Sequence, residues 1–257
     1  MDFGIKGRCA LVTGASAGIG EAVALDLARE GVRLAVAARR TDRLETVVET
    51  ARSLGAVEAH AFAADLSDPS SVTKLLDDVH RSLGDVDILV LNGGGPRAGR
   101  FADVALDDWD AGYKNVLRCM IQMVERVVPE MRSNRWGRIV ALTSTSVKQP
   151  IENLVLSNAF RTALVAALRT LANDVAREGV TVNSIATGRI LTDRLRALYP
   201  GSDTDVDAAA GKDVPIGRVA SVEEFAPLIA FLCSEKAGYI TGQTISIDGG
   251  LVRGTFG

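Results

Sequence analysis

The stretch Cys9-Ala-Leu-Val-Thr-Gly14-Ala-Ser-Ala-Gly18-Ile-Gly20 is an apolar run followed directly by a loop with three glycines. The apolar run predicts a buried strand, and the apolar spacing over residues 21–30 predicts a helix after the loop. Glycines let the backbone turn tightly and approach a pyrophosphate, whose charge then meets N–H groups at the start of the helix. The stretch therefore predicts a dinucleotide cradle, with an ordinary glycine-rich turn as the alternative.

The same alternation of short apolar runs and longer helical patterns continues to the end of the chain. Strands are expected at 9–12, 34–37, 59–63, 88–91, 139–142, 180–185 and 244–247. Helices are expected at 21–30, 43–54, 70–83, 107–132, 153–177 and 221–234. Several strands are almost continuously apolar, as strands covered on both faces must be. The prediction is an α/β fold, a doubly wound (Rossmann) seven-stranded parallel sheet with helices on both faces.

Length and composition limit the organisation of the chain. With 257 residues and 47% hydrophobic content, residues 1–257 are expected to form a single domain around one sizeable core. Only residues 190–214 interrupt the alternation, and we expect a flexible flap over the substrate there.

Charge and cysteine content exclude several classes of partner. With 29 Lys+Arg against 32 Asp+Glu, the chain lacks the excess of basic residues that is typical of a nucleic-acid-binding protein. Cys9, Cys119 and Cys233 lie far apart, so neither a disulfide framework nor a metal site is indicated. No leader segment or long apolar span is evident, so we expect a cytoplasmic protein without membrane contact.

The end of the second expected strand indicates which dinucleotide is bound. Arg39 and Arg40 stand where a fold that prefers NAD would place an acidic residue for the ribose hydroxyls. Two arginines can instead contact a 2′-phosphate, so NADP(H) is favoured over NAD(H). The alternative for Arg40 is that it merely begins a solvated helix.

The spaced motifs together resemble the short-chain dehydrogenase/reductases, most closely the subgroup that includes 3-oxoacyl-(acyl-carrier-protein) reductases. The resemblance rests on the glycine loop, Asp87-Ile-Leu-Val, Trp109, Gly137-Arg-Ile-Val, Val182-Asn-Ser, Tyr239-Ile-Thr-Gly and Asp248-Gly-Gly. It implies a small-molecule carbonyl or alcohol substrate and a homotetramer or homodimer. The implied cofactor-binding residues are Gly14, Ser16, Ala17, Gly18, Ile19, Gly20, Arg39, Arg40, Asp65, Leu66, Asn92, Gly93, Gly94, Arg161, Gly188, Ile190 and Thr192.

The family's catalytic positions are altered in this chain. Counting from Gly137-Arg138 places the family serine at Ser144, but Ser157 stands at the tyrosine position and Arg161 at the lysine position. The family asparagine position falls on Val116, and Asn115, one place earlier, would face elsewhere unless the helix bulges. The resemblance therefore implies Ser144, Ser157 and Arg161 as the site residues of a rewired proton path.

These substitutions leave two functional interpretations open. An aliphatic hydroxyl is a far weaker acid than a phenol, and an arginine stays protonated. The first interpretation is an active oxidoreductase that uses another donor, with Ser144, Lys148 and Tyr199 as candidates. The second is a catalytically impaired NAD(P)-binding protein that regulates or partners an active relative. A purely structural protein without nucleotide is a third, weaker alternative.

The resemblance also locates the subunit contacts. It implies that the helices expected at 107–132 and 153–177 pair across a two-fold axis. The second of these helices carries more apolar residues than one sheet face needs, which favours a subunit contact. The alternative is that these residues simply pack within the chain. They are Leu154, Leu164, Val165, Leu168, Leu171 and Val175.

Overall fold

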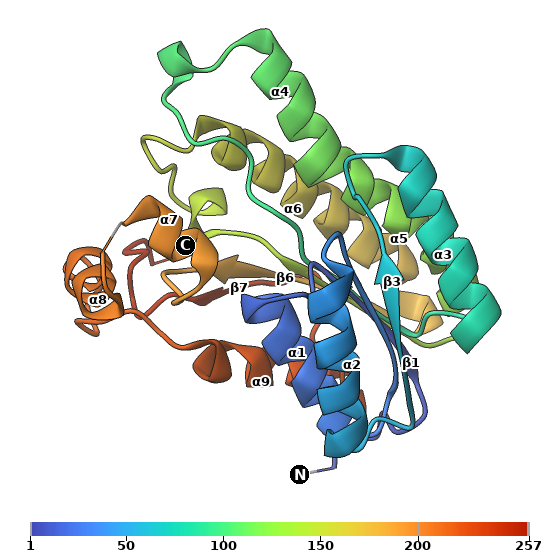
Figure 1. Ribbon diagram of the computed structural model, residues 1–257. Coiled ribbons are helices and arrows are strands. Elements are labelled where there is room, and N and C mark those ends of the chain that lie inside the picture. Colours follow the sequence, from blue (N-terminus) through green and yellow to red (C-terminus); the bar gives the residue numbers. More distant parts are fainter. Residues whose placement is uncertain (1, 200, 256–257) are drawn as a thin grey trace.

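The computed structural model describes residues 2–199 and 201–255, and its centre is a parallel sheet (Figure 1). The seven strands lie in the order β3-β2-β1-β4-β5-β6-β7, as a doubly wound sheet requires. All seven expected strands are confirmed, with ends that differ by at most two residues. They are β1 (Cys9–Thr13), β2 (Arg33–Ala38), β3 (Glu58–Ala63), β4 (Ile88–Leu91), β5 (Gly137–Leu142), β6 (Val180–Thr187) and β7 (Thr244–Ile247).

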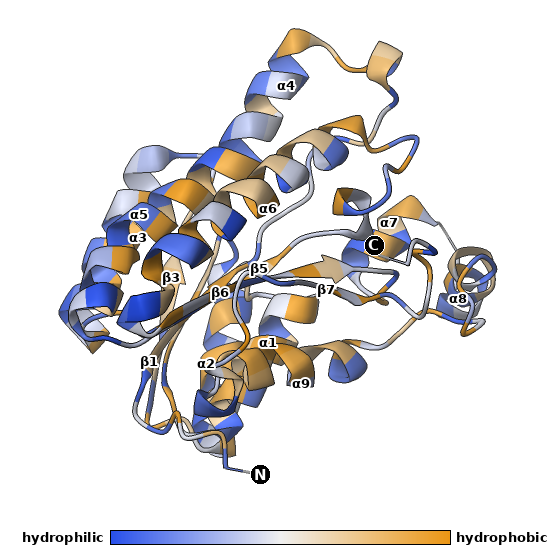
Figure 2. Cartoon of the chain, turned by 180° about the vertical axis from the view of Figure 1, so that it is seen from behind, coloured by the Kyte–Doolittle hydropathy of each residue, from blue (hydrophilic) through white to orange (hydrophobic). Residues whose placement is uncertain are grey.

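Helices cover both faces of this sheet. One layer holds α1 (Gly18–Arg29), α2 (Thr41–Leu54) and α9 (Val222–Leu232), and the other holds α3 (Pro69–Leu83), α5 (Cys119–Ser133) and α6 (Val155–Val175) (Figures 1 and 2). Alternate residues of one strand enter different cores: Ala10 and Val12 pack with the first layer, Cys9 and Leu11 with the second. The double covering explains why the strands are almost continuously apolar.

The helix expected at 107–132 is interrupted. It consists of α4 (Leu106–Gly112), a π-helical segment (Tyr113–Arg118) and α5. A π-helical turn holds more residues per turn than an α-helix and so rotates the residues that follow it. Asn115 and Val116 both lie inside this segment, so the condition for Asn115 to turn toward the site is met.

The segment expected to be an irregular flap is more regular than its sequence indicates. It contains two short helices, α7 (Asp193–Leu198) and α8 (Asp203–Gly211), beyond the ends of β6 and β7 (Figure 1). Leu195, Val206, Ala210 and Val219 form a small buried cluster that joins them. Short helices of this kind depend on their caps, and the Thr192 and Ser202 side chains both accept backbone N–H bonds.

Smaller features complete the description. Short 3₁₀ turns occur at Phe101–Asp103, Thr145–Val147, Ala176–Glu178 and Glu235–Ala237. The three cysteines are buried and unpaired, and burial raises the pKa of Cys119 to about 11. Over the described ranges, no helix is long and apolar enough to cross a bilayer, and no group of His, Cys, Asp and Glu side chains gathers as metal ligands would.

Candidate active site

The strand order creates a crevice between β1 and β4. After β1 the chain runs outward through β2 and β3, then returns to add β4 on the other side of β1. The loops that leave these two strands therefore diverge at their carboxyl ends, where open parallel sheets bind ligands. Gly14 follows β1 and Asn92 follows β4, so two of the predicted binding segments meet here.

The glycine loop has the shape of an anion cradle. Gly14 and Gly18 have φ values of 59° and 61°, in the region that favours glycine. A Cβ on Gly20 would lie 2.3 Å from the carbonyl oxygen of Gly14, so no larger residue fits there. Helix α1 begins at Gly18, and its N-cap residue, Ala17, provides no side-chain cap. The first N–H groups of the helix thus lack a side-chain acceptor, which fits a pyrophosphate.

Asn92 supports this loop directly. Its Nδ2 donates to the carbonyl oxygen of Gly14 at 3.1 Å. Its backbone N–H donates to Thr13 Oγ1 at 3.0 Å, and that hydroxyl donates to the Asn92 carbonyl at 2.7 Å. Asn92, one of the predicted cofactor-binding residues, therefore uses its side chain to fix the geometry of the loop.

A cationic corner adjoins the glycine loop. Arg40 donates from Nε and Nη2 to Ser16 Oγ at 3.3 and 3.1 Å, so it does more than begin a solvated helix. Arg39 is exposed on the other side of the same corner. The N–H and hydroxyl of Ser67 lower the pKa of the Asp65 carboxyl, and the Arg39 charge lowers it further. Ser16, Arg39 and Arg40 together form a site suited to a 2′-phosphate.

Leu66 lies close to Gly93, which follows the end of β4. A Cβ on Gly93 would stand 3.8 Å from Leu66 Cδ1 and 2.7 Å from Met120 Cε. A Cβ on Gly94 would have no neighbouring atom within 4 Å, so Gly94 borders open space. Met120 was not expected here, because its place next to Gly93 depends on how α5 packs rather than on a local motif.

The remaining predicted cofactor residues come from the end of β6. Gly188 packs against the loop after β7, since a Cβ there would lie 2.5 Å from Asp248 Cα. Ile190 is buried. The Thr192 methyl lies 3.2 Å from where a Cβ on Gly18 would be, and Asp193 pairs with Arg43 at 3.7 Å. These contacts bring α7 over the glycine loop.

The three predicted catalytic residues surround the end of β5. Ser144 Oγ accepts a bond from the Ser146 N–H at 3.1 Å. Ser157 is buried, and its Oγ lies 3.4 Å from Ser146 Oγ. Arg161 Nη1 donates to the Leu142 carbonyl at 3.0 Å. Ser146 thus connects the two predicted serines, a role that the motif spacing did not indicate.

The guanidinium of Arg161 has an unusual environment. Burial, followed by the charge of Arg194, lowers the pKa of Arg161 to about 10. The group is still protonated at neutral pH, so a cation occupies the position where the resemblance places a lysine. Arg194 is a second residue that the sequence analysis missed, although it stands two places after Thr192 in the flap.

The π-helical segment brings an asparagine to the same region. Asn115 Oδ1 is buried without a hydrogen-bond partner in the described part of the chain, while the Asn115 carbonyl accepts from Cys119 Sγ at 3.2 Å. That carbonyl lies 4.0 Å from the Cβ position of Gly93, at the end of β4. A buried acceptor without a partner is costly, so the site offers a position for a water or ligand donor.

The two alternative donors differ in their surroundings. Lys148 is half-buried and follows the Thr145–Val147 turn. Tyr199 packs against the flap cluster, and the guanidinium of Arg189 lies 5.7 Å from the centre of its ring. Tyr199 is therefore held as a packing aromatic. Another phenol, Tyr113, lies on the π-helical segment with its ring 6.4 Å from that of Phe160.

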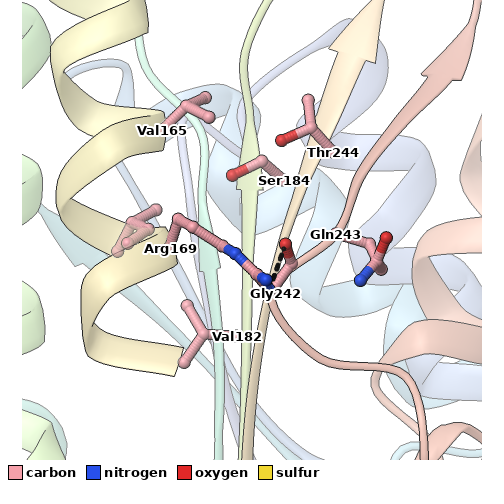
Figure 3. Close-up of a pocket in the computed structure, with 8 residues that line it drawn as sticks. Val165, Arg169, Val182, Ser184, Gly242, Gln243 and Thr244 are labelled. Carbon is pink, nitrogen blue, oxygen red and sulfur yellow. Dashed lines mark hydrogen bonds between the residues drawn. The ribbon is translucent and has the colours of Figure 1, made fainter. Parts of the chain in front are cut away.

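A small pocket between α6 and β7 lies away from this crevice (Figure 3). Arg169 crosses it and donates to the Gly242 carbonyl at 3.0 Å. Thr244, also in its wall, is the first residue of β7, so the pocket is at the amino end of that strand. Arg169 is eight residues after Arg161, about 12 Å along a helix. The pocket is therefore separate from the catalytic residues.

Comparisons with known proteins agree with this geometry. Residues 14–252 match the family model described as enoyl-(acyl carrier protein) reductase. The chain is 35% identical over 245 residues to a 3-oxoacyl-(acyl-carrier-protein) reductase of Staphylococcus epidermidis, covering 95% of this chain and 98% of that protein. The Escherichia coli protein of the same name is 34% identical over 251 residues, 98% of this chain and 99% of its own.

A solved structure extends the similarity to three dimensions. L-sorbose reductase from Gluconobacter frateurii, determined in complex with NADPH and L-sorbose, superposes with a TM-score of 0.92 at 32% identity. The match covers 99% of this chain and 100% of that one. The similarity therefore includes the flap and the crevice as well as the sheet.

Proposed function

This chain belongs to the short-chain dehydrogenase/reductase family, and from that premise we propose that it transfers hydride between NADP(H) and a small-molecule carbonyl or hydroxyl compound, using a proton path without the usual tyrosine. The observation that carries the proposal is the contact of Arg40 with Ser16 beside a glycine loop that opens into α1. The contact supports NADP(H) because it places a cation where a 2′-phosphate would lie.

The residues that would hold the cofactor follow from the site. The α1 amino terminus and Gly18 would receive the pyrophosphate, Arg39 and Arg40 the 2′-phosphate, and Leu66 the adenine. When bound, the nicotinamide supplies the hydride. Thr192 and α7 would cover this region from the flap, and we propose that residues 190–214 exclude water from the reacting carbonyl.

The chain itself must stabilise the carbonyl oxygen. Ser144 Oγ accepts from the Ser146 N–H, which orients the hydroxyl and leaves its proton for donation to a substrate oxygen. Arg161 supplies a fixed positive charge at the end of β5. Such preorganised donors lower the energy of a developing oxyanion without themselves being strong acids. We therefore assign Ser144 and Arg161 to oxyanion stabilisation and Ser157 to support of Ser146.

A second candidate function is cofactor binding without turnover. The engagement of the buried Ser157 hydroxyl with Ser146 favours it, because a hydroxyl fixed in this way is a poor replacement for a phenol acid. This protein would hold NADP(H) and act by regulating or assembling with an active relative.

One experiment distinguishes the two functions. Purified protein is mixed with NADPH and, separately, with β-keto esters, quinones and α-diketones while the NADPH absorbance is followed. We expect substrate-dependent NADPH oxidation with at least one class. NADPH binding in the micromolar range with no oxidation in any class would contradict the enzyme and favour the binding protein.

A double variant tests the altered proton path. Ser157→Tyr with Arg161→Lys restores a phenol beside an ammonium, and a positioned general acid contributes about 10²- to 10⁴-fold to rate. We expect kcat for an accepted ketone to change by at least tenfold and to gain a new pH-dependent limb. An unchanged kcat and pH profile would show that these two positions do not act in catalysis.

A further inference from the structure

Two arginine side chains from different helices reach the place where β4 and β5 end. Arg161 on α6 donates to the carbonyl oxygen of Leu142, the last residue of β5, at 3.0 Å. Arg194 on α7 donates from Nη2 to the carbonyl oxygen of Pro96, in the loop after β4, at 3.2 Å. Because β4 and β5 are paired neighbours, the Arg161 contact at the end of β5 lies beside the strand whose loop Arg194 contacts.

The close approach of Arg194 depends on a glycine. A Cβ on Gly95 would stand 3.0, 3.1 and 3.2 Å from Nη2, Cζ and Nε of Arg194. Three guanidinium atoms at nearly equal distance mean that the flat group covers this residue. The flap thus places a planar cation over the loop that follows β4.

Neither cation is neutralised within residues 2–199 and 201–255. No carboxylate of this part of the chain lies within ion-pair distance of Arg161 or Arg194. The neighbouring acid, Asp193, instead pairs with Arg43 at 3.7 Å and with Arg196 at 3.3 Å. The charge of Arg194 acts on Arg161 strongly enough to contribute to its lowered pKa. Two like charges without a counterion are unfavourable in a half-buried crevice.

The residue one helical turn before Arg161 on α6 has a small side chain. Ser157 is four residues before Arg161, so the two side chains share one face of the helix. A tyrosine at this position would place an aromatic ring beside the guanidinium. The serine is short and lies against Ser146, so no ring stands beside the guanidinium at this position.

We propose that the substrate carries an anionic group, a carboxylate or a phosphate, that Arg161 and Arg194 bind together next to the reacting carbonyl. The inference rests on the proposed function and adds the substrate class to it. Guanidinium forks match planar carboxylate and phosphate oxygens and form charge-assisted, bidentate hydrogen bonds with them. The two altered catalytic positions would then both contribute to binding the anion. Arg161 supplies the charge, and Ser157 places no aromatic ring beside it.

The cofactor pyrophosphate is the other source of the same chemistry. It would lie at the glycine loop, which α7 contacts through the Thr192 methyl. Arg194, however, donates to Pro96, which lies beyond the predicted cofactor-binding residues Asn92, Gly93 and Gly94 of the loop after β4. We therefore assign its charge to the substrate, and the measurement below separates the two anions.

The test compares an anion with its neutral ester. Oxamate and ethyl oxamate are titrated calorimetrically into the NADP⁺-loaded protein, so that the result does not depend on turnover. We expect oxamate to bind at least tenfold more tightly than its ester, and inorganic phosphate to compete with it. Arg194→Gln should reduce the preference to within about threefold, and Arg194→Lys should retain part of it. Arg169→Gln, which removes the same charge farther along α6, should behave like the unmodified protein.

The outcomes are distinguishable. Equal binding of oxamate and its ester would overturn the inference. A tenfold loss of NADPH affinity in Arg194→Gln with an unchanged oxamate preference would assign the charge to the pyrophosphate and also overturn it. Selective oxamate binding, with no NADPH oxidation by keto acids, β-keto esters, quinones or α-diketones, would contradict the proposed function while leaving the anion site in place.

Discussion

At the scale of single residues, Arg40 is the side chain that we expect to set the preference for NADP(H) over NAD(H). It is exposed, and its two donors are held on Ser16 Oγ before any phosphate arrives. A charge-assisted hydrogen bond contributes roughly 1.5–3 kcal/mol. We therefore expect Arg40→Ala to weaken NADPH binding by about 10- to 100-fold and NADH binding by less than about threefold. Fluorescence titration with both nucleotides measures the two affinities in one preparation.

The control for this prediction is Arg81→Gln. Arg81 is exposed on α3 and pairs with Asp78, so the variant removes one positive charge far from the glycine loop. Its NADPH affinity should stay as it was. An equal loss of NADPH and NADH affinity in Arg40→Ala would mean that the variant damages the loop, and the assignment of Arg40 to the 2′-phosphate would fail.

At the scale of elements, the π-helical segment Tyr113–Arg118 explains why an orphan amide oxygen lies next to the crevice. A polar atom buried without a partner costs about 1–3 kcal/mol. Replacing Asn115 by leucine, which has nearly the same shape, should raise the Tm of the cofactor-free protein by a few degrees. If the amide binds a water or substrate during the reaction, kcat should fall by at least tenfold. Thermal unfolding and steady-state kinetics check the two parts separately.

The neighbouring variant Lys114→Leu provides the comparison. Lys114 is exposed on the same segment, so its replacement removes no buried polar atom and should raise neither Tm nor kcat. A lower Tm together with full activity in Asn115→Leu would show that the amide stabilises the fold and takes no part in the site.

The same segment shows which elements the sequence could predict. Apolar spacing over 107–132 was correct in placing helical structure there, but a bulge of one residue does not change such a pattern visibly. The β-strands were predictable because burial on both faces makes them continuously apolar. The flap helices were not, since α7 and α8 are short and are fixed by the Thr192 and Ser202 caps rather than by a long amphipathic repeat.

At the scale of the whole molecule, the site combines residues that a local sequence motif places with residues that only the folding of the chain brings in. The glycine loop and the strand-end residues follow from motif spacing, and the structure places them after β1, β3 and β4. Arg194 reaches the Pro96 carbonyl across 98 positions of sequence, and no spacing rule encodes that contact. The structure therefore adds Arg194 to the site, whereas Arg161 could be placed by counting along the sequence from a motif.

Helix α6 packs several of its apolar side chains within the chain, as the alternative interpretation expected. Leu164, Leu168 and Val175, expected as surplus apolar surface, are buried against the sheet of the same chain. Val165 and Leu171 are half-buried, and the exposed positions of the helix include the small residues Ala163 and Ala166. Small side chains let helices approach closely, at the 8–10 Å typical of packed pairs. The pairing proposed from the family resemblance thus depends on close contact rather than on large apolar side chains.

A charge on this face tests whether the protein assembles through α6. We expect the unmodified chain to be a homotetramer or homodimer at micromolar concentration, with α6 beside its two-fold copy. In Ala166→Glu, two like charges would face each other across a closely packed contact, so the mass measured by light scattering after size exclusion should fall to half or less. Thr46→Glu, a charge added at an exposed position of α2, should leave the mass unchanged. If the unmodified chain is a monomer, or if Ala166→Glu keeps its full mass, the small-residue face of α6 is not the interface.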